Sequence, residues 1–207
     1  MARLTREESK ARTRSRLMEA AGKVFASRGL ERATVDEVAA EAGYTKGAFY
    51  ANFDSKEALF LAMLDQRFAE RLEEIDRVLD SGAPVAEQAR MAGQEFNAYL
   101  AGNPEWSRLF FEFGVLALRD ERFRGELVAR QRALRERIAQ GFRAHSDAIG
   151  GEPPLPAELV AAMTYAMADG FALARLLEPE SVPDDMFGTM LAVFFTGLEA
   201  MVREAAR

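Results

Sequence analysis

The stretch from Thr34 to Phe53, TVDEVAAEAGYTKGAFYANF, constrains the fold more than any other part of the chain. Thr34 can cap a helix, and Glu37, three residues later, can bond back to complete a capping box. Gly43 can adopt the left-handed conformation that ends this helix, and Thr45 can cap a second helix at once. Two short helices joined by a tight glycine turn form a helix-turn-helix, a unit whose second helix enters the major groove of DNA.

The second helix, about residues 46–51, would present Lys46 and Gly47 at its exposed first turn and turn Phe49 inward. Corners of the form helix–glycine–helix also occur in enzymes, because they need only caps and a turn residue. The pattern therefore predicts a corner that reads DNA, and it leaves an incidental corner without DNA as the alternative.

The continuous string GYTKGAFYANFDSKEALF, which runs from the turn glycine into the next helix, resembles the signature of the tetracycline-repressor (TetR) family of bacterial regulators. The detailed resemblance covers residues 10–64, and beyond it only the helix pattern and the length match. Asn52 stands where the family often has His. The resemblance implies a homodimeric transcriptional regulator whose second domain holds a small effector between its helices.

The net charge of −6 conceals an uneven distribution. Residues 1–60 hold 11 Lys+Arg against 9 Asp+Glu, or +2, whereas residues 61–207 hold 16 against 24, or −8. Because salt screens charges beyond about 10 Å, an acidic remainder does not prevent a basic tip from attracting phosphate. Lys10, Arg12, Arg14 and Arg16 form either a solvated arm or a set of phosphate contacts, and the neighbouring corner favours phosphate contacts.

The composition also limits the location and the redox chemistry. The chain has no cysteine, which rules out disulfides, thiolate catalysis and zinc-thiolate sites. No uninterrupted apolar run approaches the roughly 20 residues of a membrane span, and residues 1–14 lack the apolar core of a signal peptide. We therefore expect a cytoplasmic protein that does not use a membrane.

Helical periodicity predicts an all-α protein of about nine helices in two domains. Residues 1–53 would form a three-helix helix-turn-helix domain, whose first helix runs from a Thr5–Glu8 capping box to about Arg28. Residues 54–207 would form a helical effector-binding and dimerisation domain. Its first helix, about 56–79, would be a rod of about 37 Å that can transmit a lateral shift. The other helices are expected at about 85–101, from 104, and at about 120–144, 157–177 and 184–205.

Aromatic and methionine side chains are concentrated in the helices after residue 85. Such residues are more often plain core, but the family resemblance makes a pocket for an apolar effector an equal alternative, since Met and aromatic walls suit flat apolar molecules. The residues expected to line this pocket are Phe96, Tyr99, Trp106, Phe110, Phe113, Met163 and Met167. The arginine-rich face of residues 122–143 is most simply solvated, with affinity for an anionic ligand as the alternative.

The last two expected helices differ from the others in their apolar surface. The helix at 157–177 is apolar all round, and the helix at 184–205 carries two apolar stripes. Such helices need cover on both sides, which either a second copy or a monomeric fold that buries them can supply. We predict a four-helix dimer interface that contains Ala168, Ala172, Met186, Met190, Val193 and Gly197.

No constellation for catalysis stands out. His145, Ser146 and Asp147 are consecutive and point in divergent directions, so they cannot form a relay. The single histidine cannot build a multi-histidine metal site, and there is no glycine-rich phosphate loop. Asp169 lies on an apolar helix and needs partners, either across a dimer or in a cavity. We expect neither an enzyme nor a bound cofactor or metal.

These observations together predict a homodimeric repressor that binds a double-stranded DNA operator and is released by a small, largely apolar effector. The two recognition helices would lie about 34–36 Å apart, one turn of DNA. Thr45, Lys46 and Gly47 are expected to meet the groove, and Thr34, Tyr50, Lys56 and the basic arm are expected to bind phosphates. The full set of expected DNA contacts is Arg14, Thr34, Thr45, Lys46, Gly47, Tyr50, Asn52 and Lys56. The alternative is a helical small-molecule-binding module or enzyme whose N-terminal corner is incidental.

Overall fold

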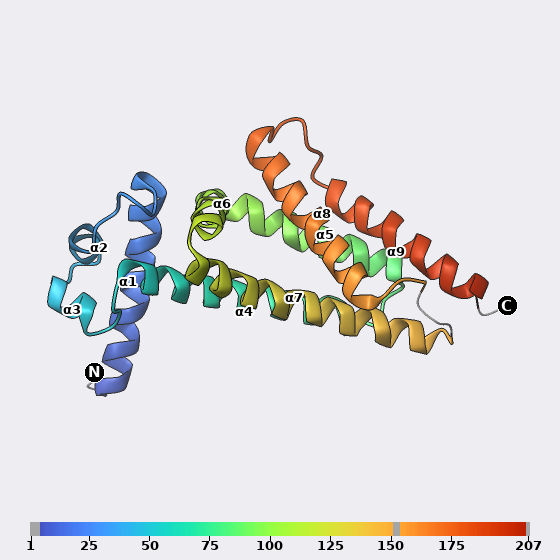
Figure 1. Cartoon of the computed structure of the whole chain (residues 1–207), viewed down its shortest axis with the longest axis horizontal. Coiled ribbons are helices and arrows are strands. Elements are labelled where there is room, and N and C mark those ends of the chain that lie inside the picture. The colour runs from blue at the N-terminus through green and yellow to red at the C-terminus, as the bar shows by residue number, and fades with distance from the viewer. Residues whose placement is uncertain (1–4, 151–153, 206–207) are drawn as a thin grey trace. The chain divides into compact units, whose positions relative to one another are not determined.

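The computed structural model describes residues 5–150 and 154–205, and these residues fold into nine α-helices without a strand. The all-α prediction is therefore confirmed. The helices are α1 Arg6–Arg28, α2 Val35–Glu41, α3 Lys46–Tyr50, α4 Lys56–Leu79, α5 Val85–Gly102, α6 Pro104–Arg119, α7 Glu121–Ala148, α8 Ala157–Leu177 and α9 Met186–Ala205 (Figure 1). The main difference from the expected ranges is α7, which continues to Ala148 instead of ending near residue 144.

The predicted caps of the first helices are present. Thr5 and Thr34 each form a capping box, with Glu8 and Glu37 respectively as the returning carboxylates. The Thr45 hydroxyl accepts a hydrogen bond from the backbone N–H of Ala48 at 3.2 Å and so caps α3. Each of these bonds satisfies an N–H that the start of a helix leaves without an intrahelical partner.

The chain divides into two compact units, Met1–Arg67 with Arg108–Glu126, and Phe68–Ser107 with Leu127–Arg207. The helices α4, α6 and α7 each contribute residues to both units. The predicted division at residues 53 and 54 is a division by role, and it stays a prediction. The two compact units have other boundaries than the predicted domains, because the first unit also includes the start of α4 and residues 108–126 of α6 and α7.

The core of the first unit is a row of buried aromatic rings. Phe25 of α1 meets Phe60 of α4 with ring centroids 6.0 Å apart, and Phe60 meets Phe113 of α6 at 4.9 Å. Phe113 in turn meets Phe123 of α7 at 5.7 Å. Figure 1 shows α2 and α3 beside α1 in this unit. Burying large rings in contact supplies much of the free energy that holds short helices in place.

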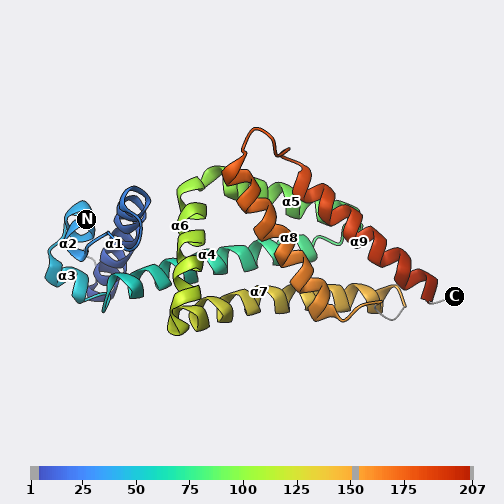
Figure 2. The same cartoon turned by 45° about the horizontal axis from the view of Figure 1, so that its top comes forward.

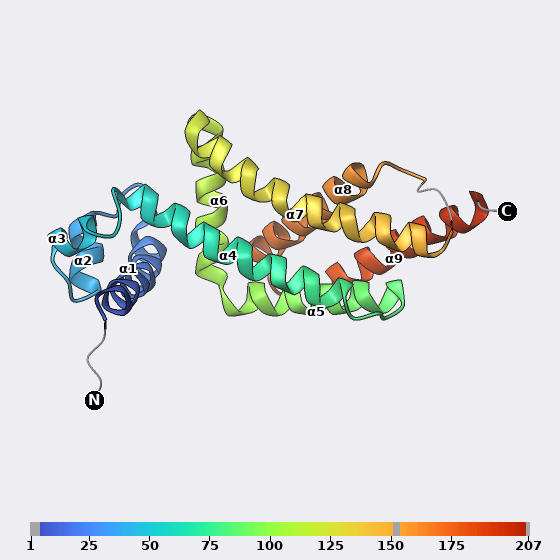
Figure 3. The same ribbon diagram turned by 90° about the horizontal axis from the view of Figure 1, so that it is seen from below.

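The second unit packs α8 and α9 against the longer helices. In Figure 3, α4, α5 and α7 run alongside one another in this unit, and Arg137 of α7 forms an ion pair with Asp76 of α4. One buried cluster joins α7, α8 and α9, namely Ala139, Phe142, Ala157, Val160, Ala161 and Leu198. These apolar residues recur at helical spacing, so each helix turns one stripe towards the same core.

The helices α5 and α9 meet at two glycines, Gly93 and Gly188. A Cβ atom added to Gly93 would lie 2.2 Å from the Cα of Gly188 and 2.4 Å from its backbone nitrogen. Real carbon atoms do not approach so closely, so the two backbones are in direct contact at this crossing. Close crossings of this kind require residues without a side chain.

Gly93→Ala should therefore destabilise the protein. The added methyl group would meet backbone atoms of α9 that cannot rotate away, and overpacking of this kind costs about 1–3 kcal/mol of unfolding free energy. Urea unfolding, followed by circular dichroism, measures the change.

Gly125→Ala in α7 is the matched control, because no atom lies within 4 Å of its added Cβ. It should stabilise α7 by up to about 1 kcal/mol, the usual preference for Ala over Gly in a helix. Equal effects of the two substitutions would contradict a tight crossing at Gly93.

Candidate nucleic-acid interface and effector domain

The helix α3 has only five residues, too few for a helix to be stable on its own. It is held by Phe49, whose side chain is 0% exposed. The Phe49 ring contacts Phe53 at 5.8 Å and Tyr50 at 5.5 Å between centroids. Packing therefore fixes the orientation of α3 and leaves its opposite face to solvent.

Four of the residues predicted to contact DNA lie on this free face of α3. Thr45, Lys46, Gly47 and Tyr50 are all exposed. A Cβ atom on Gly47 would meet only the Thr45 hydroxyl, at 3.7 Å, so its backbone is open to close approach. The structure thus brings together the part of the predicted contact set that a major groove would meet first.

Lys46 has a partner within the protein. Its Nζ donates a hydrogen bond to Oδ2 of Asp36 in α2 at 2.9 Å. This hydrogen bond, together with the negative charge of Asp36, raises the pKa of Lys46. No local sequence pattern points to Asp36, because the pairing depends on how α2 and α3 pack.

Arg14 and Asn52 are more engaged with the protein than the sequence suggests. Arg14 donates from Nη1 to the backbone oxygen of Asn52 at 3.0 Å, and its guanidinium lies 4.2 Å above the ring centre of Phe53. Asn52 donates from Nδ2 to the backbone oxygen of Ala48 at 2.8 Å. The contacts of Arg14 connect α1 to the residues that follow α3. A DNA contact by either side chain stays a prediction.

Lys56 and Thr34 use their polar atoms inside the unit. The ammonium of Lys56 donates to the backbone oxygens of Leu30, Glu31 and Ala33 at 2.9, 2.7 and 2.9 Å. An ammonium has three donors, so these bonds use all of them. The Thr34 hydroxyl is bonded to Glu37 in the capping box of α2. Their predicted contacts with phosphate are not tested, and Lys56 also has a structural use.

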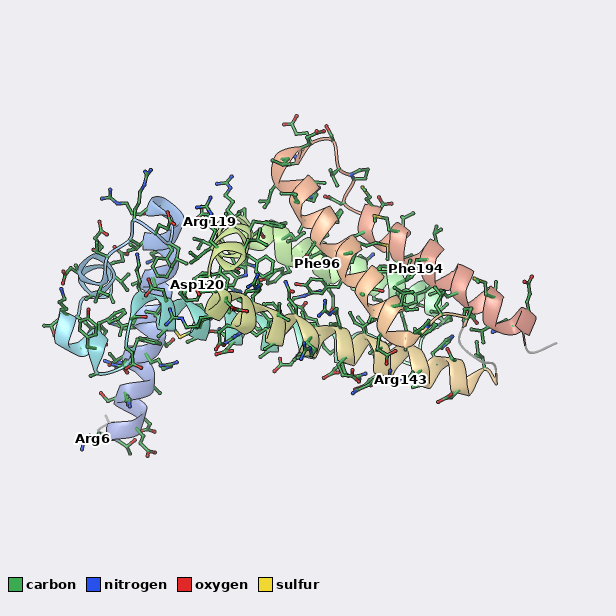
Figure 4. The ribbon with its side chains drawn as sticks, viewed as in Figure 1. Arg6, Phe96, Arg119, Asp120, Arg143 and Phe194 are labelled. Carbon is green, nitrogen blue, oxygen red and sulfur yellow. The ribbon has the colours of Figure 1, made fainter. Side chains whose placement is uncertain are left out.

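Tyr44 is a further candidate, which is absent from the contacts predicted from the sequence. It is half-buried in the turn before α3. A hydrogen bond with Thr13 and the positive charges of Arg16 and Arg12 lower the pKa of Tyr44. A hydroxyl beside two guanidinium groups can bind a phosphate oxygen. Arg6, labelled in Figure 4, projects from the N-terminal end of α1 and extends this basic arm. The signal that could have found Tyr44 is its place between the turn glycine and the α3 cap.

In the second unit, four aromatic rings from three helices are in contact. Phe96 of α5 lies 5.0 Å from Phe187 and 6.2 Å from Phe171 between centroids, and it stacks on Tyr99 at 6.4 Å. The guanidinium of Arg71 lies 4.7 Å above the Phe96 ring. Figure 4 labels Phe96 on α5, inside this group of helices. The cluster combines buried apolar rings with one half-buried cation, Arg71, which is paired with Glu74.

The structure distributes the seven predicted pocket residues over several places. Phe96, Tyr99 and Trp106 lie in the second unit, whereas Phe110 and Phe113 belong to the first, where Phe113 is part of the aromatic core. Met163 is 39% exposed, and Met167 lines a surface groove. Phe96 and Tyr99 are therefore the predicted pair that the structure brings into direct contact.

Asp169 of α8 lies in surroundings that disfavour its negative charge. Burial raises the pKa of Asp169 to about 6. Tyr165, one turn earlier, has a pKa raised by burial and by the charge of Asp169, although a hydrogen bond with Gln131 opposes the shift. The predicted partner of Asp169, across a dimer or in a cavity, stays a prediction.

The outer faces of α8 and α9 are apolar and exposed. The exposed large apolar residues on them are Leu159, Met163, Leu173 and Leu177 on α8, and Val193 and Met201 on α9. Figure 2 shows the two helices joined by a loop. A groove of about 630 Å³ is lined by Met167, Pro183, Asp185, Met186, Thr189, Met190, Val193 and Phe194.

The predicted interface residues divide between this surface and the interior. Val193 is 71% exposed, Met186 and Met190 line the groove, and Gly197 is exposed. Ala172 is only 7% exposed, so it has little surface to offer a second copy. Ala168 is half-buried. On α8, the exposed apolar residues, such as Leu173, therefore lie on a different face of the helix from Ala172.

By length and composition alone, residues 157–177 and 186–204 could each cross a membrane. The sequence prediction that no segment spans a membrane depended on uninterrupted apolar runs. Isolated charges such as Asp169 and Arg175 interrupt such a run without making the whole helix polar. Helices that pack in the interior of a soluble protein also have this length and composition. The result agrees with the exposed apolar residues of α8 and α9, which a single chain leaves uncovered.

Two family profiles match the chain. Residues 17–63 match the profile described as "Bacterial regulatory proteins, tetR family". Residues 84–203 match the profile described as "BetI-type transcriptional repressor, C-terminal". The second match alone covers more than half of the 207 residues.

Individual proteins agree with these profiles. The HTH-type transcriptional regulator TtgR of Pseudomonas putida is 28% identical and covers 97% of this chain and 96% of its own. A putative transcriptional regulator from Pseudomonas aeruginosa has a TM-score of 0.79 at 20% identity, covering 99% of this chain and 97% of that one. SmeT in complex with triclosan has a TM-score of 0.73 at 20% identity, covering 89% and 90%. SmeT is the repressor of the Stenotrophomonas maltophilia multidrug efflux pump SmeDEF. All three are named as regulators or repressors, and the two structures show the fold.

Lys56→Met should lower the stability of the first unit and also weaken DNA binding. The substitution leaves three backbone oxygens without their charged donor, which we expect to cost about 2 kcal/mol or more. Thermal unfolding measures the loss, and a gel shift with the DNA upstream of the gene measures binding.

Lys23→Met is the control, since Lys23 is exposed and forms only surface ion pairs, which contribute about 0–1 kcal/mol. If Lys56→Met weakened DNA binding without any change in melting temperature, Lys56 would be a phosphate contact and not a structural one.

Proposed function

Because the chain belongs to the tetR family of bacterial regulatory proteins, we propose that it represses transcription as a homodimer on operator DNA and leaves the operator when a small, largely apolar effector binds. The observation that carries this proposal is the exposed face of α3, with Lys46 at its first turn and Phe49 holding it in place. A regulator that binds the chromosome of a bacterium works in the cytoplasm.

The polar groups around α3 support a role in DNA binding. Lys46 and the backbone at Gly47 would meet base edges, while Tyr50 and the basic residues of α1 would contact phosphates. Neutralising about eight phosphates per dimer predicts a slope near −7 when the logarithm of the binding constant is plotted against that of the salt concentration.

The apolar outer faces of α8 and α9 support the homodimer. Leu177 and Val193 are 72% and 71% exposed in the single chain, and the groove beside them has an apolar floor of Met167, Met186 and Met190. A two-fold interface places the same patch of both subunits in contact. Two copies of an α8–α9 pair would thus form a four-helix interface that covers both faces.

The aromatic cluster of the second unit supports the proposal that a small apolar effector binds there. Phe96, Tyr99, Phe171 and Phe187 provide flat apolar walls, which bind apolar molecules by area and not by specific polar contacts. The structural relative SmeT is described in complex with triclosan. An effector among α4, α5 and α8 would shift α4, which also contributes residues to the first unit, and so change the position of the recognition helix.

Lys46→Ala should weaken operator binding by more than tenfold and leave dimerisation unchanged. The side chain is the cation nearest the start of the recognition helix, and a good contact with a base is worth about 1–3 kcal/mol, which doubles in a dimer. Protection mapping on the DNA upstream of the gene identifies the operator, and fluorescence anisotropy then measures the dissociation constant.

Arg132→Ala serves as the control for Lys46→Ala, since Arg132 is an exposed arginine of α7. An equal loss of operator binding in both variants would count against the assignment of Lys46.

Val193→Asp should convert the dimer into monomers and abolish operator binding. An aspartate at the centre of an apolar interface would be buried without a partner, which costs several kcal/mol. Size-exclusion chromatography with light scattering measures the mass of the particle.

Leu118→Asp is the matched control, because Leu118 is an equally exposed apolar residue, at 76%, but lies on α6. It should leave the dimer and the DNA affinity intact. A Val193→Asp variant that kept its mass and its operator affinity would overturn the proposed interface.

A further inference from the structure

Each of the three acids of α2 is bound to a different partner in the first unit. Glu37 bonds back to Thr34 and lies 3.5 Å from Arg28. Glu41, at the end of the helix, lies 3.6 Å from Lys23. Asp36 alone among the three is bonded to the recognition helix, through the 2.9 Å contact with Lys46. The charge that the proposed function assigns to DNA is thus already paired in the free protein.

We infer that Asp36 is a specificity-determining residue, whose carboxylate holds Lys46 so that DNA of the wrong sequence gains little from the lysine charge. This inference rests on the proposed function, in which Lys46 contacts DNA. It names a residue outside the predicted contacts, and its effect would appear as discrimination between sequences.

The geometry makes the pair a competitor of DNA and not a fixed part of the core. The side chains of Lys46 and Asp36 are 54% and 65% exposed. An exposed ion pair is weak and can open, so Lys46 remains available. The negative charge of Asp36 stays beside Lys46 after opening, however, and it repels any phosphate that the lysine approaches.

The free energy lost when the Lys46–Asp36 pair opens is compensated to a different extent on the operator and on DNA of random sequence. On random DNA, Lys46 would gain only attraction to phosphate, which the adjacent carboxylate largely cancels. On the operator, the ammonium would also donate hydrogen bonds to base edges in the major groove. Asp36 therefore lowers affinity for both kinds of DNA, and it lowers affinity for random DNA more. Such a repulsive element raises specificity without adding a contact.

The test compares Asp36→Asn with the wild-type protein on two duplexes, the protected operator and a scrambled duplex of equal length and composition. Anisotropy over a range of salt concentrations gives the dissociation constant and the salt slope for each. Asp36→Asn should tighten binding to the scrambled duplex by about 2- to 30-fold for a dimer with two such pairs. The salt slope on that duplex should steepen by about 0.9 per subunit, and binding to the operator should tighten less.

Three further variants separate discrimination from charge and from folding. Glu41→Gln removes an equal charge from the same helix but releases Lys23 instead of Lys46, so the ratio between the duplexes should stay at the wild-type value. Asp36→Glu keeps the carboxylate and should restore most of that ratio. In the Lys46→Ala background, Asp36→Asn should no longer tighten binding to the scrambled duplex, because the released lysine is absent.

The outcomes distinguish this inference from the function on which it rests. If wild-type protein protects the operator but Asp36→Asn and Glu41→Gln change the two affinities equally, the inference is wrong and the function stands. The same holds if Asp36→Asn acts fully without Lys46. If the wild-type protein shows no salt-dependent DNA binding, the proposed function fails and the inference fails with it.

Discussion

The burial of Phe49 is the constraint on which the DNA-binding side of the molecule depends. A helix of five residues forms only when other elements hold it, and one fully buried ring with two aromatic neighbours does so. The contacts of Arg14 with Asn52 and of Lys56 with three backbone oxygens secure the two ends of the same corner. The exposed face of α3 can therefore carry small and polar residues, because its stability does not depend on them.

The features of the first unit that could be predicted from sequence are those set by neighbouring residues. Both capping boxes and the Gly43 turn follow from groups three or four positions apart, so the pattern of letters contains them. The partners of Lys46 and Lys56 lie 10 and about 25 residues away, and no local pattern encodes them. For that reason the sequence identified Lys56 as a phosphate contact, and only the structure reveals its backbone bonds.

In the second unit, the helices could be predicted but the directions of their side chains could not. An apolar helix such as α8 gives no periodic signal, so the sequence could not say which face points outward. The structure turns Ala172 inward and leaves Leu173 43% exposed, a difference of one position. Phe113 and Phe96 look alike in sequence, yet they belong to different cores. Phe96 lies on α5 in the second unit, and Phe113 lies in the part of α6 that belongs to the first unit.

The glycine crossing between α5 and α9 has a mechanical consequence. Side chains at most helix contacts can change rotamer and absorb a small displacement, but Gly93 and Gly188 have none. At this crossing no side chain lies between the two backbones to absorb a displacement of either helix. A displacement of α5 beside Phe96, one turn along the helix, would therefore also move α9, the helix that carries Val193 and Met190. In the proposed dimer, an effector at the aromatic cluster would therefore act on the spacing of the two subunits through the backbones of Gly93 and Gly188.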